Sequence, residues 1–81
     1  MLPRGMDRGM LLEHLTMAEW HVANGERVLE NQQRVIEELR RDRHSDALIA
    51  AAERLLRSFE EVQSMHLADV ARLRKELAIP G

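Results

Sequence analysis

An unbroken four-three spacing of seam positions constrains this chain more than any other feature. Nine positions in residues 11–39 keep the spacing: Leu11, Leu15, Ala18, Val22, Gly25, Leu29, Gln32, Ile36 and Leu39. Such a repeat brings all of these side chains to one face of an α-helix, which is the pattern of a heptad seam. The spacing therefore predicts a long helix that packs against another helix.

A second segment restarts the same rhythm. Its expected seam positions, with an additional step of four residues after His66, are Leu48, Ala52, Leu55, Phe59, Val62, His66, Val70, Leu73 and Leu77. The additional step is a small stutter, which we expect to relax supercoiling locally. Pro80 then ends the helix.

A short polar segment separates the two periodic stretches. Asp7 and Ser45 are the expected N-caps, with Asp42 as the second choice for the second helix, because these side chains can accept a hydrogen bond from an amide of the first helical turn. So short a connection makes the two helices antiparallel neighbours. We predict an all-α fold, a coiled-coil-like antiparallel two-helix hairpin spanning 7–79 (helix 7–41, turn 42–45, helix 46–78), after a flexible lead-in at 1–6.

The chain has 81 residues and no cysteine. A chain of this size buries little surface, and small scaffolds usually add disulfides, a metal or oligomerisation. Disulfides and thiolate metal sites are excluded here. Since a lone hairpin leaves both outer faces exposed, we expect it to dimerise into a four-helix bundle.

The expected packing between the helices centres on Gly25. Folding the chain back at the turn brings Phe59 near this residue, and we predict that the ring fills the space that glycine leaves. The alternative is a tolerated glycine, at a cost of about 1 kcal/mol relative to alanine. The residues predicted to pack the hairpin are Leu15, Val22, Gly25, Leu29, Ile36, Leu55, Phe59, Val62, His66 and Leu73.

Four apolar residues away from the seam indicate an interface. Trp20 lies on the far side of the first helix, Met10 and Met17 lie close to that side, and the antiparallel register brings Leu67 near them. A cluster of Trp and Met is typical of an interface, and a merely exposed tryptophan is the alternative. We predict that these four residues bind a second copy. A foreign protein is the other candidate for the same patch.

His21 and His66 are the weak candidates for metal ligands. They are predicted to face each other across the hairpin, where Glu26 or Glu60 would add a carboxylate. His14 and His21 are about 10.5 Å apart along the helix axis, too far to share one metal. Hydrogen-bonded imidazoles or a pH-sensitive pair are the alternatives. We therefore assign no metal and no cofactor.

The charge pattern argues against nucleic acid and membrane partners. The 12 basic and 14 acidic residues are well mixed, for a formal net charge of −2. The basic residues of the turn, Arg40, Arg41 and Arg43, alternate with Asp42 and precede no aromatic platform. No apolar run approaches the roughly 18 residues of a membrane-spanning helix. The first seven residues lack the apolar core of a signal peptide, so we expect a cytoplasmic protein.

The stretch from Ala18 to Arg27, A-E-W-H-V-A-N-G-E-R, resembles a stretch A-E-x-H-V-A-x-G-E-R of small, uncharacterised helical-hairpin proteins of alphaproteobacteria. The likeness includes a glutamine-rich helical turn and the segment Leu55–Glu60, which is similar to their L-L-x-x-F-E. The resemblance implies a helical hairpin and no known activity. The chain departs from these proteins at the turn, where Arg43 and Ser45 replace Gly and Asp.

No constellation in the sequence is specific for catalysis. Nucleophile-and-base arrangements and glycine-rich phosphate loops are absent from it. We therefore predict a protein that is not an enzyme, a self-associating interaction or scaffold module whose main partner is itself, as a homodimer. The alternative function is a metal- or pH-responsive regulatory protein that uses His21 and His66.

Overall fold

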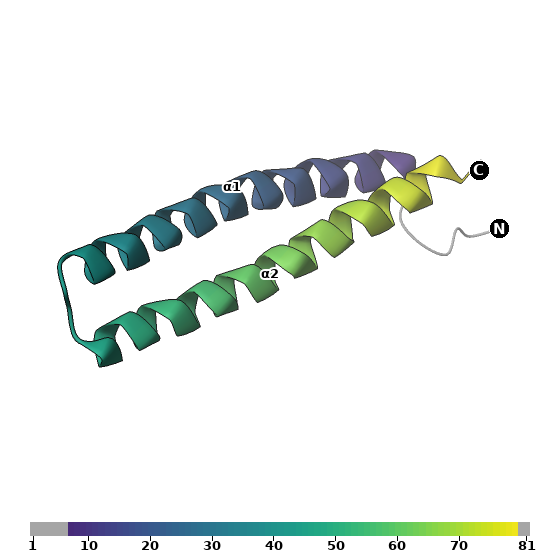
Figure 1. Cartoon of the computed structure of the whole chain (residues 1–81). Coiled ribbons are helices and arrows are strands. Elements are labelled where there is room, and N and C mark those ends of the chain that lie inside the picture. Colours follow the sequence, from purple (N-terminus) through teal and green to yellow (C-terminus); the bar gives the residue numbers. More distant parts are fainter. Residues whose placement is uncertain (1–6, 80–81) are drawn as a thin grey trace.

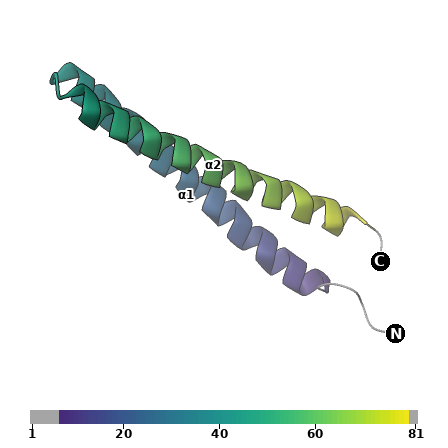
Figure 2. The same ribbon diagram turned by 90° about the horizontal axis from the view of Figure 1, so that it is seen from below.

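The computed structural model describes residues 7–79, which form two long antiparallel helices (Figure 1). Helix α1 spans Arg8–Arg41 and helix α2 spans Asp46–Ala78, and no strand occurs in 7–79. The helices run alongside each other from the turn to the open end, where α1 begins and α2 ends (Figures 1 and 2). The predicted all-α hairpin is confirmed. The predicted lead-in at 1–6 lies outside the described residues.

Each helix begins at a side-chain cap. The Asp7 carboxylate accepts a 2.8 Å hydrogen bond from the Met10 amide, and the Ser45 hydroxyl oxygen accepts a 3.2 Å bond from the Leu48 amide. These bonds satisfy amides of the first turn that have no partner within the helix. The caps are therefore the two residues that the sequence indicates.

The C-terminus of α1 closes on an arginine in a left-handed conformation. The Arg43 amide donates to the Arg40 carbonyl at 3.1 Å and the His44 amide donates to the Leu39 carbonyl at 3.0 Å, which is the Schellman pattern. This pattern needs a positive φ at its penultimate residue, and Arg43 has φ 56°. Glycine is usual there, because a Cβ costs about 1–2 kcal/mol in this conformation. The turn therefore contains local strain.

The buried face of α1 follows the predicted seam. Leu11, Ala18, Gln32 and Ile36 are buried, and Leu15, Val22, Gly25, Leu29 and Leu39 are half-buried. Every position of the four-three repeat thus turns toward α2. The apolar periodicity of this helix sufficed to place its face.

The seam of α2 differs from the expected one. The buried and half-buried positions that keep the four-three spacing are Ile49, Ala52, Leu56, Phe59, Gln63, His66, Val70, Leu73 and Leu77. This spacing has no additional step, so the predicted stutter is wrong. Leu55 and Val62, expected inside the seam, lie at its edge and are 46% and 48% exposed. The prediction assigned Leu55 to the seam in place of its equally apolar neighbour Leu56, and Val62 in place of the polar Gln63.

The tightest packing lies toward the open end. Leu11, Ala18, Val70 and Leu73 form the buried cluster there, with Leu15, Val22 and Leu77 packed against it. Leu73 is the most buried of them, at 2% exposed. The Cα atoms extend only 16 Å and 14 Å across the long axis, so the core is a single seam between two helices.

Candidate interaction surface

Two buried glutamines interrupt the apolar seam. The Gln63 side-chain amide donates a 3.0 Å hydrogen bond to the Val22 carbonyl, and the Gln32 amide donates a 2.9 Å bond to the Ala52 carbonyl. Each bond joins one helix to the backbone of the other. Sliding the helices would leave a buried amide without its acceptor, which is unfavourable. The two glutamines therefore help to fix the register of the hairpin.

Gly25 makes room for one of these glutamines. A Cβ at Gly25 would overlap Oε1 of Gln63 and lie 2.6 Å from its Cδ. Gln63 therefore occupies the space that was predicted for the ring of Phe59. Phe59 is half-buried and lines a hollow beside Gly25 instead. The periodicity did not reveal this contact, because glutamine is a weak seam signal.

His21 and His66 stack across the hairpin, as expected from the antiparallel register. Their ring centroids are 4.9 Å apart and their planes differ by 12°, and the Trp20 ring meets His21 edge-on at 5.4 Å. The ring nitrogens direct their lone pairs within each ring plane, so nearly parallel rings do not converge on one ion. Within 7–79, no group of three or more His, Asp or Glu side chains could hold a metal ion.

One side of the hairpin carries ion pairs between the helices. Arg40 pairs with Glu53, and Arg74 pairs with Glu19 at 2.8 Å. Helical positions seven residues apart lie in one row along the helix. On this side, one row of α1 and one row of α2 lie beside the seam, and we call these two rows the charged flank. Between residues 19 and 40 of α1 and residues 53 and 74 of α2, its members are Glu19, Glu26, Gln33, Arg40, Glu53, Glu60, Leu67 and Arg74. Leu12, which is 51% exposed, continues the α1 row toward the open end.

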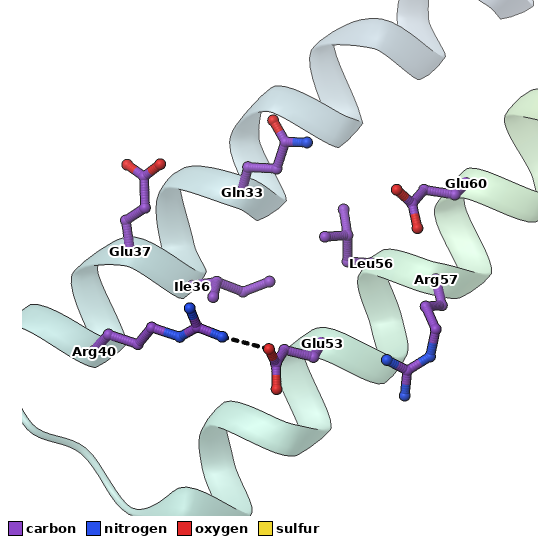
Figure 3. A pocket seen from close by; sticks show the side chains of 8 residues that line it. All are labelled: Gln33, Ile36, Glu37, Arg40, Glu53, Leu56, Arg57 and Glu60. Carbon is purple, nitrogen blue, oxygen red and sulfur yellow. Dashed lines mark hydrogen bonds and ion pairs between the residues drawn. The ribbon is translucent and has the colours of Figure 1, made fainter.

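Figure 3 shows the part of the charged flank nearest the turn. A hollow of about 380 Å³ opens there between the helices. Ile36 and Leu56 lie between the helices within it, and Arg40 reaches across to Glu53 (Figure 3). Both partners of this ion pair are substantially exposed, so the pair contributes at most about 1 kcal/mol. The charged rim keeps this side suited to water.

The opposite side of the hairpin has a different composition. On each helix, we consider the row beside the seam and the next row outward. These rows contain no Asp, Glu, Lys or Arg within residues 17–35 of α1 and 48–65 of α2, which are twelve positions in all. We call these positions the uncharged flank: Met17, His21, Asn24, Val28, Asn31 and Val35 on α1, and Leu48, Ala51, Leu55, Ser58, Val62 and Met65 on α2. The flank ends toward the open end at Asp69 and Arg72.

Large apolar side chains are exposed on the uncharged flank. Leu48, Leu55 and Val62 follow one another at seven-residue spacing along α2, and each is between 45% and 48% exposed. Val28 on α1 lies near Val62, since both line a hollow of about 220 Å³ with Phe59 and the histidine stack. The flank thus forms an apolar strip beside the seam, interrupted by the polar side chains of His21, Asn24, Asn31 and Ser58.

The structure divides the four residues predicted as an interface. Met17 belongs to the uncharged flank, and Met10 lies one heptad before it in the same row. Trp20 is exposed on the outer face of α1, where it lines a small apolar hollow with Thr16 and Met17. Leu67 is exposed on the charged flank, in the row between Glu60 and Arg74.

The exposed leucines and valines of the uncharged flank were missed as a surface. Their signal was present, because Leu48, Leu55 and Val62 keep a strict heptad spacing, as do Val28 and Val35. On α2 this spacing was interpreted as the seam itself. The positions of Ile49, Leu56 and Gln63 inside the seam show that Leu48, Leu55 and Val62 form an additional row.

Comparison with known proteins shows no match to any family model, and no curated protein or solved structure is significantly similar to the chain. The resemblance of residues 18–27 to alphaproteobacterial hairpin proteins therefore stays a prediction. Neither of the two described helices combines the length and the apolar character needed to cross a bilayer.

Proposed function

We propose that this chain is a non-enzymatic, self-associating interaction module whose hairpins pair into a four-helix bundle. The observation that carries the proposal is a core that is closed on one side only, by the other helix. The hairpin buries one seam, and apolar side chains of both helices stay exposed beside it. Packing against another hairpin would remove these side chains from water, which is the main driving force of association.

The exposed area supports this proposal. The chain exposes 6451 Å². A compact monomer of 9.4 kDa would expose about 5000 Å². A stable interface usually buries about 800 Å² on each partner. The accessible area of the hairpin therefore exceeds that of a compact monomer by more than one standard interface buries on each partner.

The width of the apolar stripe supports the same conclusion. A helix in a two-helix seam needs apolar residues at two heptad positions, whereas a helix in a bundle core adds a third position on one side. Val28 and Val35 supply this third position on α1, and Leu48, Leu55 and Val62 supply it on α2. Both helices thus carry the pattern of a four-helix bundle.

Thermal unfolding at several protein concentrations tests the proposal. Because association stabilises the folded state by mass action, the unfolding midpoint should rise with concentration over about a hundredfold range. A midpoint that does not move, in a chain that is fully helical throughout, would contradict self-association.

A second candidate function is favoured by the stack of His21 on His66. Two protonated imidazoles at 4.9 Å would repel each other. Asp69 and Arg72, which share a hollow with His21, carry opposite charges that offset one another. The test compares how the unfolding midpoints of the wild type and of His66→Gln depend on pH between pH 5 and pH 7.5. Equal pH dependence in both proteins would eliminate this candidate.

A further inference from the structure

We propose that the second copy binds on the uncharged flank, flank against flank about a two-fold axis, so that four helices enclose a new core. This inference rests on the proposed self-association and adds the surface that performs it. The occupant is another copy of this chain, as three observations on the flank indicate.

The first observation is the charge distribution. In a two-fold interface, the same surface patch faces itself. The charged flank has four acidic side chains (Glu19, Glu26, Glu53 and Glu60) and two basic ones (Arg40 and Arg74), so it would face its own copy with a net negative charge, which is unfavourable. The Arg34 guanidinium reaches the outer edge of the uncharged flank, where it donates to Asn31, and Asp69 and Arg72 lie beside Met17 and His21 at its open end. Between these borders the uncharged flank presents no formal charge. It can therefore be buried against itself without leaving an unpaired ion.

The second observation is the size of the flank. From Met17 to Val35 the strip is about 27 Å long at the rise of an α-helix. Two adjacent helices make it about 20 Å wide. The projected area is therefore on the order of 500 Å². Because the helical surface is corrugated, its accessible area exceeds this projection and approaches the roughly 800 Å² that each partner of a standard interface buries.

The third observation is the shape of the flank. Val28, Phe59 and Val62 line the hollow of about 220 Å³ between the helices, together with His21, Asn24, Gly25, Gln63 and His66. An apolar side chain of the facing copy can enter such a hollow, in the manner of packed helix bundles. Met17 and Met65 lie in the outer rows, and flexible methionines fill irregular gaps at interfaces.

Trp20 does not provide an equivalent two-fold surface. It lies on the outer face of α1, in the row that contains Glu13 and Arg27. Leu67, its expected companion, lies on the charged flank. An interface that included both residues would also have to bury the ion pair of Arg74 with Glu19.

Matched leucine variants test the assignment. Leu55→Glu changes the uncharged flank, and Leu67→Glu is the control on the same helix, with nearly equal exposure of 46% and 51%. Light scattering should give a dimer mass for the wild type and for Leu67→Glu. For Leu55→Glu the dimer dissociation constant should rise at least tenfold, because burying an unpaired carboxylate is costly. Circular dichroism checks that each protein is helical.

Met65→Glu keeps the test informative if Leu55→Glu does not fold. Its side chain is 67% exposed in the hairpin, so the substitution leaves the seam intact, and it should also weaken the dimer. A monomeric wild type would overturn both the self-association and its surface. A dimeric wild type whose mass is lowered by Leu67→Glu or Trp20→Ala, and not by Met65→Glu, would overturn the surface alone.

Discussion

At Gly25 the backbone of α1 comes so close to α2 that the Gln63 amide lies directly against it. The amide donates to the Val22 carbonyl, while its own carbonyl oxygen is buried and accepts no hydrogen bond from the described part of the chain. The contact with Gln63 therefore requires glycine at this position, although glycine weakens the helix.

Substitutions at both residues should be strongly coupled. Gly25→Ala alone should lower the free energy of unfolding by about 1 kcal/mol, because loss of the buried hydrogen bond outweighs the gain of about 1 kcal/mol in helix propensity. With Gln63→Ala in place, Gly25→Ala should instead raise it by about 1 kcal/mol. Urea unfolding of the four proteins at one concentration measures the coupling. Additive effects would contradict the contact.

The strained turn residue gives a second prediction at this scale. Arg43→Gly should raise the free energy of unfolding by about 0.5–1 kcal/mol, since relief of the left-handed strain exceeds the entropy that glycine adds to the unfolded chain. The control Arg41→Gly lies in the right-handed helix and should lower it by up to about 1 kcal/mol. The prediction fails if both variants are destabilised equally in urea.

At the scale of the helices, the caps determine where each helix begins. Ser45→Ala removes the acceptor for the Leu48 amide and should lower the free energy of unfolding by about 1 kcal/mol. Ser64→Ala, at an exposed position within α2, should be neutral or slightly stabilising because alanine favours the helix. Comparison of the two unfolding curves checks the cap. Equal curves would show that Ser45 does not serve as one.

The helices themselves were largely predictable from the sequence, and the exact face of α2 was not. Apolar spacing and the caps at Asp7 and Ser45 suffice for helix type, extent and antiparallel order. On α2, adjacent apolar residues such as Leu55 and Leu56 make two different faces compatible with the apolar spacing of a seam. The seam turns toward Gln63 because Gly25 and the Val22 carbonyl lie opposite it, and these partners are far away in the sequence.

At the scale of the whole molecule, the two flanks of the hairpin differ in chemistry. Interhelical ion pairs cross the charged flank, whereas the other flank presents Val28, Leu48, Leu55 and Val62 to solvent. From the sequence we predicted the surface for a second copy around Trp20, whereas our proposal from the structure assigns it to the uncharged flank. Heptad rows could be assigned to flanks only after the register of both helices was known.

Nuclear magnetic resonance of a mixed sample tests the central claim most directly. Chains with isotope-labelled methyl groups are combined with unlabelled chains, and only contacts between different copies are recorded. We predict intermolecular nuclear Overhauser effects among the methyl groups of Val28, Leu55 and Val62. Effects confined to Trp20 and Leu67, or no intermolecular effect at all, would contradict the pairing of hairpins through the uncharged flank.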